Sequence, residues 1–376
     1  MQVPRVMKFF IRSIFSTALL MGCCLAGFTQ EADVLSFLRR IDMKMYDSQH
    51  SAKVDTAYIH IPDERWTIKT SADLTANNIA VSHFDRDVGY ISHLSSAPSY
   101  SQGITVAWRW FEFGIGVNPS WFFPKIRNND QSYSISVYGN RMGLSATMRY
   151  ADTFRGFSMT LPDSSLVKIP VGVCKDLSGD FDAYYVFNAE KYSYPAAFSM
   201  MQVQKRSAGS AIASVSVRNA VTTFDPEVLK PGYDGENVPV SPGPQSGDIS
   251  IADIAIAALR GEVEAGKSTL YTNVLALGGG YAYNFVTKND WLIHASAMAN
   301  LSLLSYNMMK TETDKYMLRR TFPDWVGSFQ VSVIHWKGSW FYGANVIARG
   351  SVIGKITNLN FSNYRTEGHF VVGVRL

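Results

Sequence analysis

The sequence is poor in charge and in cysteine, and beyond its first residues it has no long apolar run. Only 18% of its 376 residues are charged, and the formal net charge is +4. The first 29 residues contain three basic residues and no acidic one, so a chain without them would carry a net charge of +1. This excludes a polybasic nucleic-acid surface, and we expect no nucleic-acid partner. A hydrophobic fraction of 47% excludes a disordered chain.

The main apolar stretch stands at the N-terminus. Residues 14–28 are uncharged and mostly apolar, and they follow Arg5, Lys8 and Arg12. This order is typical of a secretory signal peptide, so we predict that residues 1–29 are cleaved, with a short membrane anchor as the alternative. No later stretch supplies 18 consecutive apolar residues, because polar residues and glycines interrupt the longer uncharged runs such as 268–287. A membrane-spanning helix needs about 20 apolar residues, so the sequence excludes an integral helical membrane protein.

Cysteine is nearly absent from the predicted mature chain. Cys23 and Cys24 fall in the signal segment and leave Cys174 alone, although Leu20-Met21-Gly22-Cys23 keeps lipid attachment at Cys23 open. One thiol forms no internal disulfide, and no Cys/His cluster offers a zinc site, so we predict no metal and no cofactor. Such an exported chain must be stabilised by its core or by a closed hydrogen-bonded sheet.

The C-terminal residues alternate strictly with period two. Tyr364, Phe370 and Val372 fall on an apolar face, and Arg365 and Glu367 fall on the opposite face. A strand between lipid and a watery lumen has this pattern. We predict an all-β fold, a transmembrane antiparallel β-barrel of about 12 strands (range 10–14). The expected strands are 66–75, 102–117, 132–139, 142–151, 180–188, 195–204, 209–219, 270–286, 291–304, 325–337, 339–350 and 364–376.

Two further patterns support a barrel. Tight turns at Thr287–Asp290 and Lys337–Gly338 contrast with long connections at 307–324 and 351–363, and short turns on one side with long loops on the other are typical of outer-membrane barrels. A change of phase near Trp110 predicts a bulge within 102–117. Aromatic residues at predicted strand ends are expected to form interfacial girdles: Trp121, Phe122, Phe123, Tyr184, Tyr185, Tyr281, Tyr283, Trp291, Trp336 and Trp340.

The predicted organisation is a signal peptide at 1–29, a periplasmic segment at 30–62 and a barrel at 63–376, with a long acidic loop at 222–267. Residues 222–264 contain eight acidic residues against two basic ones. Two interpretations are open: the loop binds divalent cations through its carboxylates, or it is a solvated loop without a ligand. It contains no D-x-D-x-D-G spacing.

Three segments resemble the domain of unknown function 4421 family, which is found in Bacteroidota. They are residues 191–210 (KYSYPAAFSMMQVQKRSAGS), Gly279–Phe285, and the strand with Trp66 after Tyr58-Ile59. The resemblance extends from about Asp55 to Leu376 and implies a secreted or outer-membrane β protein. It implies no activity, so it assigns no catalytic residue. Leu376 differs from the terminal aromatic residue usual in outer-membrane barrels.

One motif suggests nucleotide chemistry. Residues 261–268 match the phosphate-loop pattern G-x-x-x-x-G-K-[ST] at every fixed position. Glu262 and Glu264, however, place negative charge where phosphates would bind, and the following Gly-rich, aromatic segment favours a strand over the required helix. We therefore predict no nucleotide partner.

A second motif suggests lipid hydrolysis. His294 and Ser296 have the His-x-Ser spacing of barrel lipid A deacylases, and Asn300 lies on the same face. Trp291 and Ile293 mark the opposite face as apolar, so we expect His294 and Ser296 to form hydrogen bonds in the lumen.

The sequence thus predicts an outer-membrane barrel without catalysis, acting as a pore or as a surface or structural protein. Its expected partners are outer-membrane lipid, lipopolysaccharide and the barrel-assembly machinery. The alternatives are a barrel lipid hydrolase using His294 and Ser296, and a secreted soluble β protein. Six arginines predict a basic, mildly anion-preferring lumen: Arg109, Arg149, Arg218, Arg349, Arg365 and Arg375.

Overall fold

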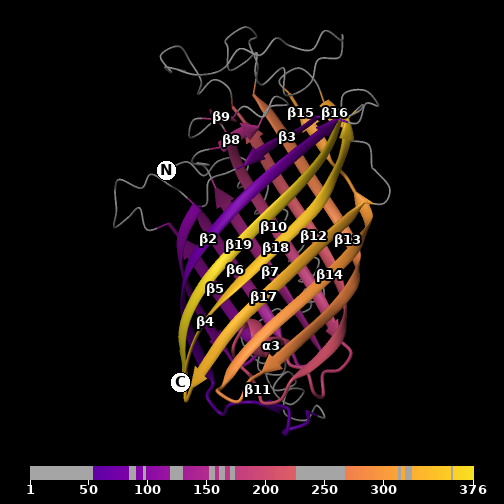
Figure 1. Cartoon of the computed structure of the whole chain (residues 1–376). Coiled ribbons are helices and arrows are strands. Elements are labelled where there is room, and N and C mark those ends of the chain that lie inside the picture. The colour runs from indigo at the N-terminus through magenta and orange to yellow at the C-terminus, as the bar shows by residue number, and fades with distance from the viewer. Residues whose placement is uncertain are drawn as a thin grey trace, which may run out of the picture. The chain divides into compact units, whose positions relative to one another are not determined.

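The computed structural model describes residues 54–83, 90–95, 99–118, 130–151, 157–160, 166–169, 174–225, 267–311, 315–317, 324–356 and 359–376. They belong to one compact unit, Ala52–Leu376. Twelve antiparallel strands of this unit close into a barrel (Figure 1), which confirms the predicted fold class. The barrel strands are β2 (Trp66–His83), β4 (Ser99–Trp108), β5 (Phe111–Val117), β6 (Gln131–Tyr138), β7 (Met142–Ala151), β10 (Cys174–Val186), β12 (Ala208–Phe224), β13 (Ser268–Val286), β14 (Trp291–Ser305), β17 (Trp325–Lys337), β18 (Trp340–Ile356) and β19 (Leu359–Arg375).

The first and last strands close the barrel. β19 pairs with β18 on one side and with β2 on the other, where Arg375 lies opposite Thr67 and Leu359 opposite His83. The other strands follow one another round the sheet in chain order. Closure matters because lipid offers no hydrogen-bond partner to an unpaired sheet edge.

Short elements lie at both ends of the barrel. At the end with the longer connections are β3 (Tyr90–Ser95), β8 (Phe157–Thr160), β9 (Leu166–Ile169), β15 (Met308–Lys310) and β16 (Lys315–Met317) (Figure 1). At the end with the tight turns, β1 (Ile59–His60) pairs with β11 (Val203–Gln204), and the helix α3 (Tyr194–Phe198) lies nearby. No helix within the described ranges is long and apolar enough to span a membrane.

The strand count is as predicted, but two of the predicted elements are wrong. Residues 102–117 form two strands, β4 and β5, joined by a two-residue turn in which Arg109 has a φ of 54°. The change of phase near Trp110 therefore marks a hairpin and not a bulge. Residues 195–204 contain α3 and the two-residue β11 in place of a barrel strand. The two errors cancel in the count.

The tight turns are confirmed, while one long loop is corrected. Thr287–Asp290 joins β13 to β14, and Gly338 with φ 62° joins β17 to β18. The predicted loop at 351–363 is largely strand, because β18 and β19 continue their pairing as far as Ile356 opposite Leu359.

The two faces of the barrel differ as the alternation predicted. Outward side chains are apolar: Ile104 is 60% exposed, Phe370 61% and Val372 49%. Tyr281, Tyr283 and Trp340 also point outward, as expected of girdle residues. Tyr184 and Trp336 were predicted to belong to the girdles, but both are buried inside the barrel. The predicted girdle residues 121–123 lie outside the described residues.

Candidate functional site in the barrel lumen

The connection between β10 and β12 folds into the lumen at the end with the tight turns. We call residues 187–207 the plug. Its helix α3 begins where the Ser193 hydroxyl accepts a hydrogen bond from the Ala196 amide at 3.1 Å, and Pro195 stands in the first turn. Proline suits that position because its missing N–H would have no helical partner there. The local sequence therefore favours a helix at the start of the segment for which alternation alone predicted a strand.

Hydrogen bonds fix the plug to the barrel. The Gln204 amide oxygen accepts from the Ser193 amide at 2.9 Å and from Asn284 Nδ2 at 3.0 Å, and its nitrogen donates to three backbone carbonyls. Gln202 Nε2 donates to Asn140 Oδ1 at 2.6 Å. Arg375 Nε donates to the Met200 carbonyl at 2.9 Å. The plug is therefore bonded to several barrel strands and to the chain's last residues.

Apolar packing seals the same region. Ala196, Ala197 and Met200 are buried against inward side chains of β14, β17, β18 and β19, among them Leu292 and Phe341. Tyr192 and Tyr194 pack on the other side of the plug with side chains of β10 and β12. Burial raises the pKa of both phenols above the ordinary tyrosine value, so they remain neutral hydroxyls. The plug therefore packs tightly inside the barrel, and we call its surface toward the lumen the floor.

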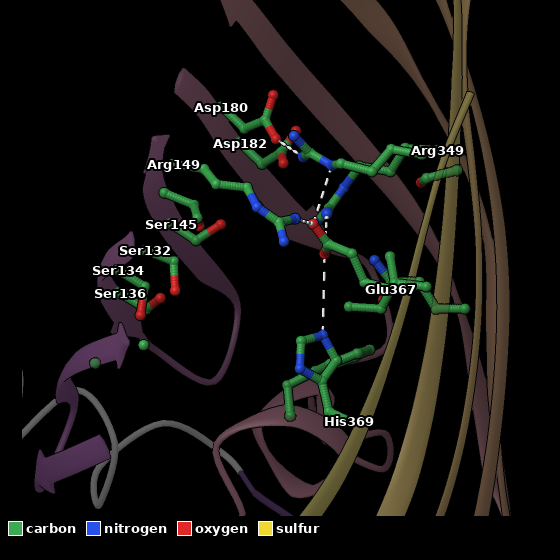
Figure 2. A pocket seen from close by; sticks show the side chains of 18 of the residues that line it. Ser132, Ser134, Ser136, Ser145, Arg149, Asp180, Asp182, Arg349, Glu367 and His369 are labelled. Carbon is green, nitrogen blue, oxygen red and sulfur yellow. Dashed lines mark hydrogen bonds and ion pairs between the residues drawn. The ribbon is translucent and has the colours of Figure 1, made fainter. Parts of the chain in front are cut away.

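Charged side chains cross the lumen above this floor. Glu367 on β19 binds Arg149 at 3.4 Å, Arg349 at 2.9 Å and Arg365 at 2.9 Å. Arg365 also binds Asp180 on β10. Arg218 binds Asp182 at 2.7 Å and lies 3.5 Å from Asp180. We call these seven residues the ion lattice, and Figure 2 shows most of them meeting in the middle of the pocket.

The ion lattice joins opposite walls of the barrel. In the closed order of strands, five strands separate β10 from β19 in each direction. The Arg365–Asp180 pair, 185 positions apart in sequence, thus spans the lumen. Buried charges are tolerated only when paired and hydrogen-bonded, and here each group has a partner of opposite charge. Ion pairs therefore cross the lumen in addition to the plug.

A cavity of about 270 Å³ lies around the ion lattice, and inward side chains of eleven of the twelve barrel strands line it. One of its walls is the inner face of the strands from β2 to β7. Hydroxyl groups line that wall, and Ser132, Ser134, Ser136 and Ser145 face the lattice across the hollow in Figure 2. Tyr138, Tyr184, Tyr194 and Phe198 line the cavity on the side of the plug. His369 borders it as well, with Nδ1 2.7 Å from Asp73 Oδ1.

The structure corrects the prediction of a basic lumen. Arg149, Arg218, Arg349 and Arg365 do face inward, but acidic residues of β10 and β19 compensate them. The other two predicted arginines lie away from the cavity. Arg109 is in the β4–β5 turn with its guanidinium 5.1 Å from the Trp108 ring, and Arg375 binds the plug.

His294 and Ser296 lie on the inner face of β14, away from lipid, with exposed fractions of 0% and 4%. His294 Nδ1 is 2.8 Å from Asn284 Oδ1, and the ring packs edge-on against Phe198 with centroids 5.0 Å apart. His294 Nε2 and Ser296 Oγ both lack a hydrogen-bond partner among the described residues, so neither activates the other. The expected lumen hydrogen bonds are thus made by His294 but not by Ser296. Asn300 bonds instead to Ser214 and Ser216, each at 2.8 Å.

The phosphate-loop match lacks the structure that such a site needs. Ser268 opens strand β13, whereas a phosphate-binding loop leads into a helix whose N-terminus faces the phosphates. Lys267 is 3.5 Å from Asp225 across the base of the connection. Residues 226–266, with most of the acidic loop, lie outside the described residues, as do residues 1–53 with the predicted signal peptide and Cys23. Cys174 is buried and free.

Sequence reasoning missed two of the three acidic residues of the ion lattice. Asp180 and Asp182 fall within a strand that was predicted without a facing assignment. Their spacing of two, continued from Ser178, was the available signal, because it puts all three on one face of a strand. Similar spacing of Ser132, Ser134 and Ser136 marks the hydroxyl wall.

Comparisons with known proteins identify the family of this chain. No curated protein matches the sequence. Among solved structures, the chain is similar to the outer membrane protease OmpT from Escherichia coli (6% identity, TM-score 0.40, covering 84% of this chain and 97% of that chain). It is also similar to the β domain of the Bordetella autotransporter BrkA (9%, 0.30, 82% and 99%) and to the Pseudomonas putida toluene transporter TodX (7%, 0.25, 84% and 91%). Residues 53–376 match DUF4421, a domain of unknown function, and the chain belongs to this family.

Proposed function

We propose that this chain is an outer-membrane barrel without catalysis, held closed by its plug and its ion lattice. It acts as a surface or structural protein and not as a constitutive diffusion pore. The observation that carries this proposal is the crossing of the lumen by Arg365 with Asp180 and by Arg149 with Glu367. A diffusing solute would have to displace these pairs and then the packed plug beneath them.

The outer face supports a membrane location. Side chains such as Leu304, Phe370 and Ile104 are at least 60% exposed, on a barrel whose interior is polar. In water this surface would be an aggregation hazard, whereas in a bilayer it is the expected belt. Lipid and lipopolysaccharide are then the surrounding partners, and the barrel-assembly machinery inserts the chain. Retention in the outer-membrane pellet after a carbonate wash would distinguish this from a secreted soluble β protein.

The environment of His294 argues against a lipid hydrolase. A nucleophile and its base must lie within hydrogen-bond reach of each other and of the substrate. His294 is covered by Phe198 of the plug and faces away from the acyl chains. Purified protein mixed with phospholipid or lipid A and calcium is therefore expected to release no fatty acid.

Planar-bilayer recording tests the closed state. The wild-type barrel is expected to show no steady channels. A variant in which residues 189–206 are replaced by Asn-Gly, combined with Arg149→Ser and Arg365→Ser, should conduct, because it lacks both obstructions. Heat-modifiable migration on a gel confirms that each sample contains folded barrel. Steady wild-type channels would refute the closed state.

A further inference from the structure

We propose that the lumen cavity is a binding site for a neutral polyhydroxyl molecule of about monosaccharide size. The cavity volume of about 270 Å³ is slightly below that of typical small-molecule sites, which are roughly 300–1,000 Å³, and so suits a small ligand. The inference deepens the proposed function, because it gives the closed lumen a ligand. It depends on the cavity and not on whether the barrel conducts.

The hollow exists because most inward side chains of one wall, formed by strands β4 to β7, are small. Gly114 and Gly116 of β5 pair with Ser134 and Ser132 of β6. A Cβ built on Gly114 would lie 2.5 Å from Ser134 Oγ, so even alanine would press against the hydroxyl. Gly103 of β4 is equally confined, with Asp73 Oδ2 at 2.9 Å from its Cβ position. Glycine and serine on these strands leave room that larger lumen residues would fill.

Hydroxyl groups predominate on the same wall. Seven of its inward residues carry a hydroxyl on neighbouring strands: Ser101, Thr105, Ser132, Ser134, Ser136, Ser145 and Thr147. Each hydroxyl both donates and accepts, and it rotates to suit its partner. A polyol presents the same dual groups along its edge. An array of hydroxyls on one side and guanidinium and carboxylate groups on the other suits such a ligand.

Charge balance points to a neutral ligand. The lining contains the four arginines of the ion lattice, and Asp73, Glu112, Asp180, Asp182 and Glu367. Glu112 is paired with Lys69 at 2.6 Å, which leaves four carboxylates against four guanidinium groups when His369, 2.7 Å from Asp73, is counted as neutral. A net-charged ligand would gain little in such a site and would lose its hydration. A neutral ligand avoids this cost.

The floor supplies an apolar platform. Tyr194 stacks between Tyr184 and Phe198, with ring centroids 4.3 Å and 4.5 Å away. The Tyr184 hydroxyl is buried at this floor and has no hydrogen-bond partner among the described residues. A buried hydroxyl without a protein partner usually bonds to water or to a ligand. Aromatic rings next to polar groups match the C–H faces and hydroxyl edges of a sugar ring.

Isothermal titration of the folded, detergent-solubilised barrel tests the proposal. The panel contains D-glucose, D-galactose and D-mannitol, the charged analogues D-glucuronate and D-glucosamine, and the zwitterion L-serine. We expect saturable binding of at least one neutral polyol, at least ten-fold tighter than any charged or zwitterionic compound.

Variants on β6 locate the site. Ser134→Leu fills the cavity and should weaken binding at least ten-fold, while Ser134→Ala keeps the space and should weaken it only a few-fold. Ile135→Leu, on the lipid face of the same strand, is the matched control and should bind as the wild type does. Heat-modifiable migration shows whether each variant is folded.

Three results would overturn the proposal. One is that the folded wild-type barrel binds no neutral polyol of the panel. Another is that glucuronate, glucosamine or serine binds most tightly. The third is that folded Ser134→Leu, or Ser134→Ala if the leucine variant does not fold, binds no more weakly than Ile135→Leu. Conductance of the wild-type barrel is measured separately, so a failure of the closed state would be recognised as such.

Discussion

Glu367 is the residue on which the ion lattice depends most. It binds three arginines from β7, β18 and β19, and its second oxygen lies 3.9 Å from His369 Nε2. Its side chain is only 13% exposed, so water compensates little of this charge. A single carboxylate therefore balances positive charge contributed from opposite walls of the barrel.

Replacing Glu367 by glutamine should destabilise the barrel by about 3 kcal/mol, because it leaves three buried guanidinium groups without their shared counter-charge. Urea unfolding in lipid vesicles, followed by tryptophan fluorescence, measures the change. Thr366→Val, exposed on the lipid side of the same strand, is the control and should change stability little. Equal stabilities for Glu367→Gln and the wild type would mean that the ion lattice does not brace the barrel.

At the scale of the element, β19 shows how period-two alternation determines which side chains of a strand face lipid and which face the lumen. Its lipid face contains Phe370 and Val372, and its lumen face contains Arg365, Glu367 and His369. The strand has paired neighbours on both sides for its whole length. A charged side chain placed on the lipid face therefore has no partner of opposite charge there. The strand cannot shift its register to move that side chain into the lumen.

We expect Val372→Lys to cost about 2–4 kcal/mol if it lies near the bilayer midplane, and to impair assembly. The fraction of protein in the fast-migrating folded band, measured on an unheated gel, reports this loss. Val372→Ile keeps the apolar face and should fold as the wild type does. A Val372→Lys barrel as abundant as the wild type would contradict the assigned facing of β19.

At the scale of the whole molecule, stability should depend on the barrel and its lumen contacts and not on the acidic connection between β12 and β13. These strands already pair from Phe224 opposite Ser268 onward. Deleting residues 232–258 should therefore leave the folded band on the unheated gel intact. Loss of that band, with Val372→Lys still folded, would refute the strand register.

The sequence by itself determined the class of the fold and the face of many residues, whereas the number of strands agreed only because two errors cancelled. Period-two alternation fixes which side chains meet lipid, because successive residues of a strand point to opposite faces. The sequence did not determine the structure at Arg109, because a two-residue turn and a β-bulge produce the same change in the phase of the alternation. Pro195 after Ser193 was a local helix signal that the alternation concealed.

The tertiary structure alone decided what fills the lumen. Asp180 and Arg365 meet because closure puts β10 opposite β19, and no local pattern records which strands lie across a barrel. The plug enters the lumen because Gln204 and Asn284, which are distant in sequence, satisfy its polar groups there. Strand periodicity is a local property set by the backbone, whereas lumen contacts depend on barrel closure and strand register. The barrel could therefore be predicted from the sequence, and its plug, ion lattice and cavity could not.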